Sequence, residues 1–245
     1  MSKIDFYNVK MDILDTGETL KIFEGFLRSG SPKSVFFINA HCFNIAQKNE
    51  EYRKVINDAD LLLNDGIGIK LGANLLHQKV KENMNGTDFI PVALKFAAEN
   101  NLKVYFLGAG KGVAESAKNK IEKKINGLNI VGVHDGYFDD AEETKIIEDI
   151  NEKKVDMLIV GMGVPKQELW VAKNMARFET VKISIAGGAI LDFMAERFKR
   201  APVFMQKSGL EWLFRLSNEP KRLFKRYAVG IPVFFYYAFK LKRKS

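Results

Sequence analysis

The chain has 245 residues, of which 47% are hydrophobic, so it can bury one sizeable core and is too apolar for a disordered protein. Its net charge of +8 is unevenly placed, because residues 1–196 hold 25 basic and 28 acidic side chains (net −3) and residues 197–245 hold 13 basic and 2 acidic (net +11). A single cysteine, Cys42, excludes a disulfide framework, and with only three histidines it argues against a Cys/His zinc site.

Short apolar runs alternate with amphipathic segments of helical length as far as Gly188. This alternation is typical of parallel strands joined by crossover helices. Several runs, such as VFFI and MLIV, contain no polar residue, as in strands that are covered on both faces. We therefore expect an α/β fold with a mostly parallel central sheet, whose predicted strands are 34–38, 60–63, 103–107, 129–133, 155–160 and 181–185.

Capping residues mark the starts of several predicted helices. Thr87 or Asp88 is expected to cap a helix that ends near residue 100. Asp139, with Glu142 three residues later, predicts a capping box at the start of the next acidic helix. Two further segments have the length and spacing of helices, 112–125 and 165–178.

The alternation of strands and helices stops after Gly188, and the remaining chain predicts helices separated by prolines. We divide the chain into a core of residues 1–195 and an appendage of residues 196–245. In the appendage, Ser217 or Asn218 is expected to cap the second of two helices.

Cations and aromatic side chains are interleaved in the appendage, as in an interfacial membrane anchor. A basic helix that packs on the core with solvated lysines is the alternative. The longest uncharged stretch of the appendage, 227–239, has 13 residues, against the roughly 20 that a spanning helix needs. No apolar run follows the charged start of the sequence, so we expect no signal peptide. The apolar side chains of the expected anchor are Trp212, Phe214, Leu223, Phe224, Phe234, Phe235, Tyr236 and Tyr237.

Glycine and polar residues follow every predicted strand, in the segments INAH, NDGIG, LGAGKG, HDGYF, GMGVPKQE and AGGAILD. In open parallel sheets, ligands bind beyond the carboxyl ends of the strands, where helix N-termini favour phosphate. These segments therefore predict a ligand crevice. LGAGKG matches neither the dinucleotide fingerprint nor a P-loop, so Gly108 and Ala109 belong either to a tight turn or to a cradle for a nucleotide diphosphate.

Asp65, in NDGIG, has two interpretations. It is either the N-cap of the following helix or a general base, since Gly66 and Gly68 leave room for a substrate beside it. In either case a helix N-terminus is expected to lower the pKa of this carboxyl.

Lys166, Gln167 and Glu168 either begin a solvated helix or hold a diphosphate or a uracil ring without a metal. His41 and His134 follow predicted strands and either face the crevice or are structural imidazoles. No Asp-x-Asp follows a strand, which disfavours a metal-bound sugar nucleotide.

The segments INAHCFN, DGIGI, NGTDFIP, HDGYF, GMGVPKQELW and GLEWLFRLSNEPKRLFKRY stand in this order along the chain. Together they resemble the WecG/TagA/CpsF family of bacterial glycosyltransferases, from about residue 4 to residue 227. The resemblance implies a Rossmann-like core and a basic, helical appendage that meets the membrane and helps to close the site. It also implies inverting, metal-independent transfer of a sugar from a UDP-sugar, commonly UDP-N-acetylmannosamine, to an undecaprenyl-diphosphate-linked sugar.

Carried over by position, Asp65 falls on the family's proposed catalytic base, and Asn39 falls on the Asn of its first strand-end motif. Two positions depart from the family pattern. Phe37 stands where many members have Thr, and Asn83 stands where they have Arg. These departures leave the donor sugar open among N-acetylmannosamine, glucose and a uronic acid.

Gln167, with Lys166 and Glu168, falls on the family's PKQE segment. Arg215 and Arg222 fall on appendage arginines that are thought to engage the diphosphate. The spacing of Arg215, Arg222 and Arg226 would place them on one face of a continuous helix. The residues predicted to bind substrate are Asn39, His41, Gly66, Thr87, Asp88, Gly108, Ala109, His134, Gly136, Lys166, Gln167, Gly187, Gly188, Arg200, Arg215, Arg222 and Arg226.

These observations predict a peripheral enzyme on the cytoplasmic face of the plasma membrane that works in wall polymer, capsule or exopolysaccharide synthesis without a cofactor. Homo-oligomerisation is left open. An NAD-dependent oxidoreductase is one alternative, but it would need the missing G-x-G-x-x-G motif. A nucleic-acid-binding protein would explain the basic appendage, but its aromatic residues suit lipid better.

Overall fold

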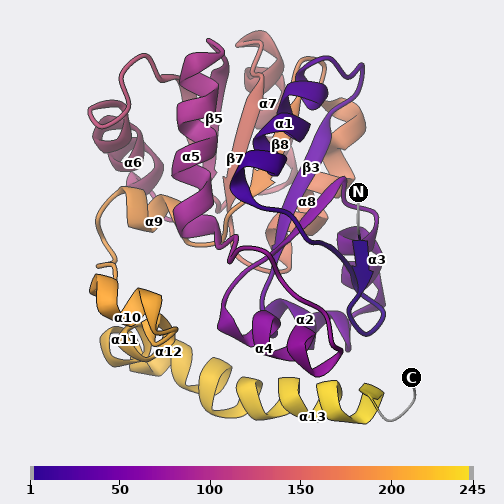
Figure 1. Ribbon diagram of the computed structural model, residues 1–245. Helices are drawn as coiled ribbons and strands as arrows, with labels where there is room; N and C mark the ends of the chain where they lie inside the picture. Colours follow the sequence, from indigo (N-terminus) through magenta and orange to yellow (C-terminus); the bar gives the residue numbers. More distant parts are fainter. Residues whose placement is uncertain (1–2, 243–245) are drawn as a thin grey trace.

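A computed structural model describes residues 3–242 as a sheet covered by helices on both faces (Figure 1). The sheet has eight strands in the order β1-β2-β4-β3-β8-β7-β5-β6, and all neighbours are parallel except β1 and β2. The strands are β1 (Lys3–Asp5), β2 (Lys10–Asp12), β3 (Lys33–Ile38), β4 (Leu61–Asn64), β5 (Lys103–Gly108), β6 (Asn129–His134), β7 (Met157–Gly161) and β8 (Ile183–Ala186).

The predicted α/β fold with a mostly parallel sheet is confirmed, and each predicted strand is present within a few residues of its expected bounds. The prediction missed β1 and β2, which have three residues each and therefore too little sequence to show a pattern. In β2, the buried Asp12 side chain accepts a hydrogen bond from Leu62 N at 2.9 Å, which helps to hold this short strand beside β4.

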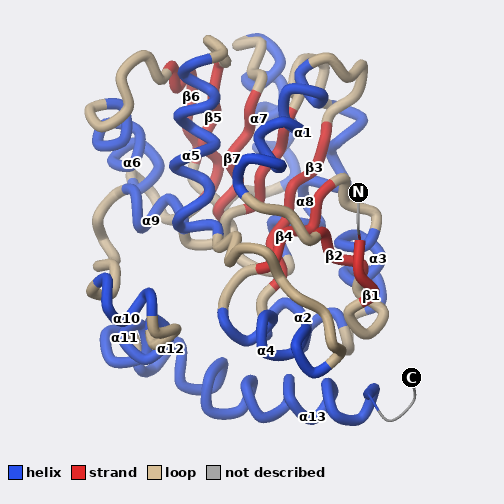
Figure 2. The backbone as a smooth tube through the Cα atoms, in the orientation of Figure 1, coloured by secondary structure: helices blue, strands red, loops and turns tan. Residues whose placement is uncertain are grey.

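Helices lie on both faces of the sheet (Figure 2), and a hydrophobic core fills the space between the sheet and the helices on each face. One is formed with α1, α5, α6 and α9, and the other with α2, α3, α4, α7 and α8. The bounds of these helices are α1 (Thr16–Leu27), α2 (Ala40–Ala46), α3 (Glu50–Asn57), α4 (Ile67–Leu75), α5 (Gly86–Glu99), α6 (Val113–Glu122), α7 (Asp140–Glu152), α8 (Lys166–Asn174) and α9 (Ile190–Met194).

The helix caps agree only in part with those expected from the sequence. Asp139 caps α7 by accepting from Glu142 N at 2.9 Å, which confirms the predicted cap but gives only one of the two bonds of the predicted capping box. The cap of α5 is Asn85, not Thr87 or Asp88, because Asn85 Oδ1 accepts from Asp88 N at 3.0 Å, and the helix begins two or three residues earlier than expected.

The appendage consists of short helices that lead into one longer helix. They are α10 (Val203–Lys207), α11 (Glu211–Asn218), α12 (Pro220–Phe224), a π-helical turn (Lys225–Val229) and α13 (Gly230–Lys242). The expected caps Ser217 and Asn218 are wrong, because both side chains donate to Phe214 O within α11. No helix among residues 3–242 is both long enough and apolar enough to span a bilayer.

The helix α13 runs beneath α2 and α4 and packs on the core (Figure 1). Its Phe234 is fully buried and contacts the rings of Phe6 and Phe43 at centroid distances of 6.0 and 5.3 Å. Asn44 of α2 donates to the backbone oxygen of Gly230 at 2.7 Å. The appendage is therefore fastened to the core by an aromatic cluster and a hydrogen bond.

Gly72 of α4 lies against this cluster. A Cβ atom at this position would lie 2.6 Å from Phe6 and 2.8 Å from Phe234, whereas a Cβ at Gly25 in α1 would meet nothing within 4 Å. We expect Gly72→Ala to lower the free energy of unfolding by about 1–3 kcal/mol through overpacking. The matched variant Gly25→Ala should instead raise it by about 0.5–1 kcal/mol. Urea unfolding tests both, and equal effects would contradict the close packing of α13.

Candidate active site

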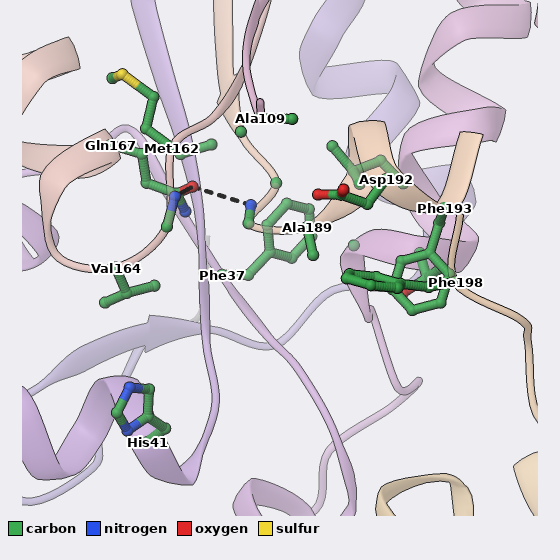
Figure 3. Close-up of a pocket in the computed structure, with 18 of the residues that line it drawn as sticks. Phe37, His41, Ala109, Met162, Val164, Gln167, Ala189, Asp192, Phe193 and Phe198 are labelled. Carbon is green, nitrogen blue, oxygen red and sulfur yellow. Dashed lines mark hydrogen bonds between the residues drawn. The ribbon is translucent and has the colours of Figure 1, made fainter. Parts of the chain in front are cut away.

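A cavity of about 690 Å³ lies over the carboxyl ends of the parallel strands, and we term it the rim cavity (Figure 3). Its walls come from the loops after β3, β4, β5, β6, β7 and β8 and from the appendage. In Figure 3, Met162, Val164 and Gln167 lie on one side of Phe37, and Asp192, Phe193 and Phe198 lie on the other. The strand-end segments therefore meet in one crevice, as the sequence predicted.

A second cavity of about 390 Å³ lies between α4 and the appendage, and we term it the α4 groove. Apolar side chains from α4, α11 and α13 line much of it. These side chains are Ile67, Leu71, Trp212, Ile231, Phe234 and Phe235. The two cavities meet at a common wall, which we term the junction and which consists of Asn39, His41, Asp65, Arg215, Arg226 and Tyr227.

Asp65 lies at the junction, where Asn39 holds its carboxylate. The Asn39 side-chain oxygen caps α2 by accepting from the backbone N–H groups of His41 and Cys42 at 3.0 and 3.1 Å. This fixes the Asn39 amide nitrogen toward Asp65, to which it donates at 3.0 Å. One oxygen of the carboxylate is thus oriented by a group whose own direction is set by a helix start.

Burial raises the pKa of Asp65 above its ordinary value, although the bond from Asn39 and the charges of Arg215 and Arg226 act in the opposite direction. The expectation of a lowered pKa is wrong. Asp65 does not cap a helix, because α4 begins after Gly66 without a side-chain cap. A raised pKa makes the carboxylate a stronger proton acceptor at neutral pH.

His41 stands beside Asp65 at the junction. Burial, followed by the positive charge of Arg226, lowers the pKa of its imidazole to about 4. The ring is therefore neutral at pH 7 and adds no positive charge to the site.

The buried Gln167 joins two of the glycine loops. Its side-chain oxygen accepts from Gly163 N at 3.1 Å and from Gly188 N at 3.0 Å, and Figure 3 draws a hydrogen bond at this oxygen. Its amide nitrogen donates to Glu168 at 2.8 Å. Gln167 therefore ties the loop after β7 to the loop after β8, and Glu168 fixes the orientation of the amide.

Burial raises the pKa of the Glu168 carboxyl to about 7. The protonated form is thus favoured in the folded protein, so this group reduces stability as pH rises from about 4.5 to about 7. As pH rises through this range, the free energy of unfolding of Glu168→Gln should increase relative to that of the wild type by about 3 kcal/mol. Urea unfolding at pH 5 and pH 8 measures the difference, and a constant difference would contradict the raised pKa. Glu168→Gln keeps an acceptor for Gln167, whereas Glu168→Ala removes it and serves as the comparison.

Lys166 bridges two strand-end loops at the edge of the rim cavity. Its ammonium donates to the backbone oxygen of Gly136 at 2.7 Å and lies 5.1 Å from the centre of the Phe138 ring and 6.0 Å from that of Tyr137. The Tyr137 side chain is 79% exposed and lines the cavity, so it leaves an open aromatic face beside a cation.

The appendage contributes arginines, Arg215 and Arg226 among them, to the lining of the rim cavity. Arg215 donates to the Thr87 hydroxyl at 3.2 Å and to Glu211 at 2.8 Å, and its guanidinium lies 4.7 Å from the centre of the Phe193 ring. Arg226 lies over the Tyr227 ring at 5.8 Å and forms no ion pair with the side chains that the structure describes. The charges of Arg215 and Arg226 act on Asp65, and that of Arg226 also acts on His41, so two cations stand at the junction.

Most residues predicted to bind substrate line one of the two cavities. They are Asn39, His41, Gly66, Thr87, Ala109, Gly136, Lys166, Gln167, Gly187, Gly188, Arg215 and Arg226, together with the predicted base Asp65.

Four predicted residues, Asp88, Gly108, His134 and Arg200, line neither cavity. Arg200 forms an ion pair with Asp88 at 2.8 Å and joins the appendage to α5. Gly108 lies where a Cβ atom would stand 2.3 Å from the backbone oxygen of Gly161, so it permits close approach of β5 and β7. His134 faces Glu142 at 3.5 Å. Arg222 belongs to α12, and its side chain lies outside the described part of the structure.

Several residues at the site were not predicted from the sequence. Tyr137 and Asp192 belong to the strand-end segments HDGYF and AGGAILD, so their position in those segments was an available signal. Glu211 had no such signal, because it reaches the α4 groove only through the folding of the appendage onto the core. Among the described residues, no cluster of three or more His, Cys, Asp or Glu side chains is placed to hold a metal ion.

The two departures from the family pattern both have defined places. Phe37 lines the rim cavity and packs against Phe89 at a centroid distance of 6.2 Å. Asn83 lines the α4 groove and accepts from Gly66 N at 2.7 Å, so it holds the loop that follows Asp65. One departure therefore faces each cavity.

A glycine-rich cavity with several cations, over the carboxyl ends of a parallel sheet, is typical of α/β proteins that bind phosphorylated ligands. Comparison with known families gives the particular class. The chain belongs to the glycosyl transferase WecG/TagA/CpsF family, whose model matches residues 4–245. The resemblance seen in the sequence is thereby confirmed, and the protein is a glycosyltransferase.

Similar proteins occur in Staphylococcus aureus strains MRSA252, MW2 and NCTC 8325 / PS 47. Each is 30% identical to this chain over 245 residues, which cover 99% of this chain and 94% of the relative. Each is named N-acetylglucosaminyldiphosphoundecaprenol N-acetyl-beta-D-mannosaminyltransferase.

Proposed function

We propose that the protein moves a sugar, N-acetylmannosamine or a related hexose, from a UDP-sugar to a sugar carried on undecaprenyl diphosphate. The observation that carries this proposal is the position of Asp65 at the junction of two cavities, within reach of a ligand in either. The names of the Staphylococcus aureus relatives supply the acceptor class.

The donor would occupy the rim cavity. Its diphosphate would lie over the glycine loops that Gln167 ties together, close to Lys166 and the appendage arginines. Backbone N–H groups and fixed cations favour the charge that develops on a departing nucleoside diphosphate.

The reaction would be a single displacement at the anomeric carbon. The acceptor hydroxyl attacks this carbon from the junction and gives its proton to Asp65. The new C–O bond forms as the bond to the β-phosphate oxygen breaks, and its electron pair leaves with UDP. Attack from the side opposite the leaving group inverts the anomeric configuration.

The protein would work as a peripheral enzyme on an anionic membrane surface. The appendage carries exposed apolar side chains, including Phe204, Phe224, Tyr236 and Phe239, beside its basic residues. Such a mixture favours binding at the interface, where each basic residue close to an anionic leaflet contributes roughly 1 kcal/mol.

A screen of UDP-sugars with a short-chain lipid-diphosphate-N-acetylglucosamine acceptor tests the proposal. One UDP-sugar should give UDP release and a disaccharide product, and addition of EDTA should leave the rate unchanged. Nuclear magnetic resonance of the product should show an inverted anomeric centre. Retention of configuration, or no transfer from any UDP-sugar, would overturn it.

A further inference from the structure

Resting on the proposed function, we propose that the α4 groove is a binding site for the polyprenyl chain next to the acceptor's diphosphate, and that Leu71 of the core helix α4 contacts that chain. The appendage is thus one wall of the lipid site and α4 is the other.

The lining of the two cavities changes from polar to cationic to apolar in the same order as the parts of the acceptor. The acceptor hydroxyl has to reach Asp65 at the junction, where Arg215 and Arg226 also stand. Beyond these cations the lining changes to Ile67 and Leu71 on one side and to aromatic side chains of α11 and α13 on the other. A sugar, a diphosphate and a hydrocarbon chain follow one another in the same order in the acceptor.

The wall of the groove that α4 forms carries exposed apolar side chains. Ile67 and Leu71 are 40% and 46% exposed, although both belong to a helix of the α/β core. Apart from Tyr137, every large apolar side chain that is exposed among the described residues lies on α4 or in the appendage. The groove is therefore continuous with the apolar surface that the proposed function places against lipid.

The charged residues that line the groove also suit a hydrocarbon chain that follows a diphosphate. Lys70 lines the groove beside Leu71, and the acidic residues that line it are Asp65 and Glu211. Glu211 is held by Arg215 at 2.8 Å and Arg200 at 3.5 Å, so its charge is balanced by the appendage. A neutral hydrocarbon chain that follows an anionic diphosphate fits this lining, whereas a second nucleotide would leave the apolar wall unused.

Leu71 and Leu213 form a matched pair for the test. Both are leucines on helices, and they are 46% and 44% exposed, but Leu71 lines the α4 groove and Leu213 lines neither the groove nor the rim cavity. The acceptors are one N-acetylglucosamine diphosphate series with one, two or three isoprene units. They are assayed without vesicles and below their aggregation concentrations, so that membrane binding does not enter the comparison.

For the wild type, kcat/KM should rise by about tenfold or more from the one-unit to the three-unit acceptor, because each fully buried methylene adds up to about fourfold. Leu71→Ser should reduce this ratio at least threefold, whereas Leu213→Ser should keep the wild-type ratio. Thermal unfolding of both variants checks that the fold is intact.

A wild-type rate that does not depend on chain length, or an equal effect of the two substitutions, would overturn the groove assignment while leaving the proposed transfer intact. Absence of transfer to every acceptor would overturn the proposed function and the groove with it.

Discussion

Asp65→Asn is expected to lower kcat for sugar transfer by about 10²–10⁴-fold, the range for loss of a general base. The asparagine can still accept the hydrogen bond that Asn39 donates, so the junction should keep its geometry. Only the capacity to take the acceptor's proton is removed. Turnover of the variant, with product detected by chromatography, is the measurement.

Binding of UDP to Asp65→Asn is the control for this experiment. Calorimetry should give a dissociation constant within about twofold of the wild type, because the diphosphate is assigned to the glycine loops and cations and not to Asp65. Wild-type turnover in the variant would exclude Asp65 as the base, and lost UDP binding would show a different role for it.

Arg226→Gln is expected to lower kcat by about 10²–10³-fold, as for removal of one group that stabilises developing charge. Its neighbour Lys225 provides a matched control, since it is exposed and lines neither cavity. Lys225→Gln should leave turnover with a soluble acceptor near the wild-type value. Both variants should weaken binding to anionic vesicles to a similar extent.

The comparison of Arg226 with Lys225 separates catalysis from membrane binding. An equal loss of turnover in the two variants would mean that the appendage acts only through its net charge. Deletion of the appendage is a less direct test, because Phe234 is buried against Phe6 and Phe43 and its removal would also open the core.

The sequence predicted the sheet well because its central strands are long apolar runs, which parallel packing requires. It also predicted that Asn39, Asp65 and Gln167 would line one crevice, because the carboxyl ends of parallel strands lie at one edge. The short strands β1 and β2 at one end of the sheet were missed because each has three residues, too few to show a pattern; β1 pairs with β2, and β2 pairs with β4.

Side-chain roles were harder to predict than positions. Gln167 was expected to contact a ligand, yet its oxygen is used by two backbone N–H groups and its nitrogen by Glu168. Phe234 was expected in a membrane anchor, yet it is fully buried in an aromatic cluster. Phe6 and Phe43, the partners of Phe234, are distant in sequence, so no local pattern could have revealed them. Gln167 combines two nearby partners, Gly163 and Glu168, with the more distant Gly188.

The most direct test of the account is the structure of the protein with a bound, non-hydrolysable UDP-sugar. We expect the diphosphate to lie in the rim cavity, over the loops that Gln167 joins. The anomeric carbon should face Asp65, and the α4 groove should remain open for the acceptor. A nucleotide bound away from Asp65 and Gln167, or inside the α4 groove, would contradict the account.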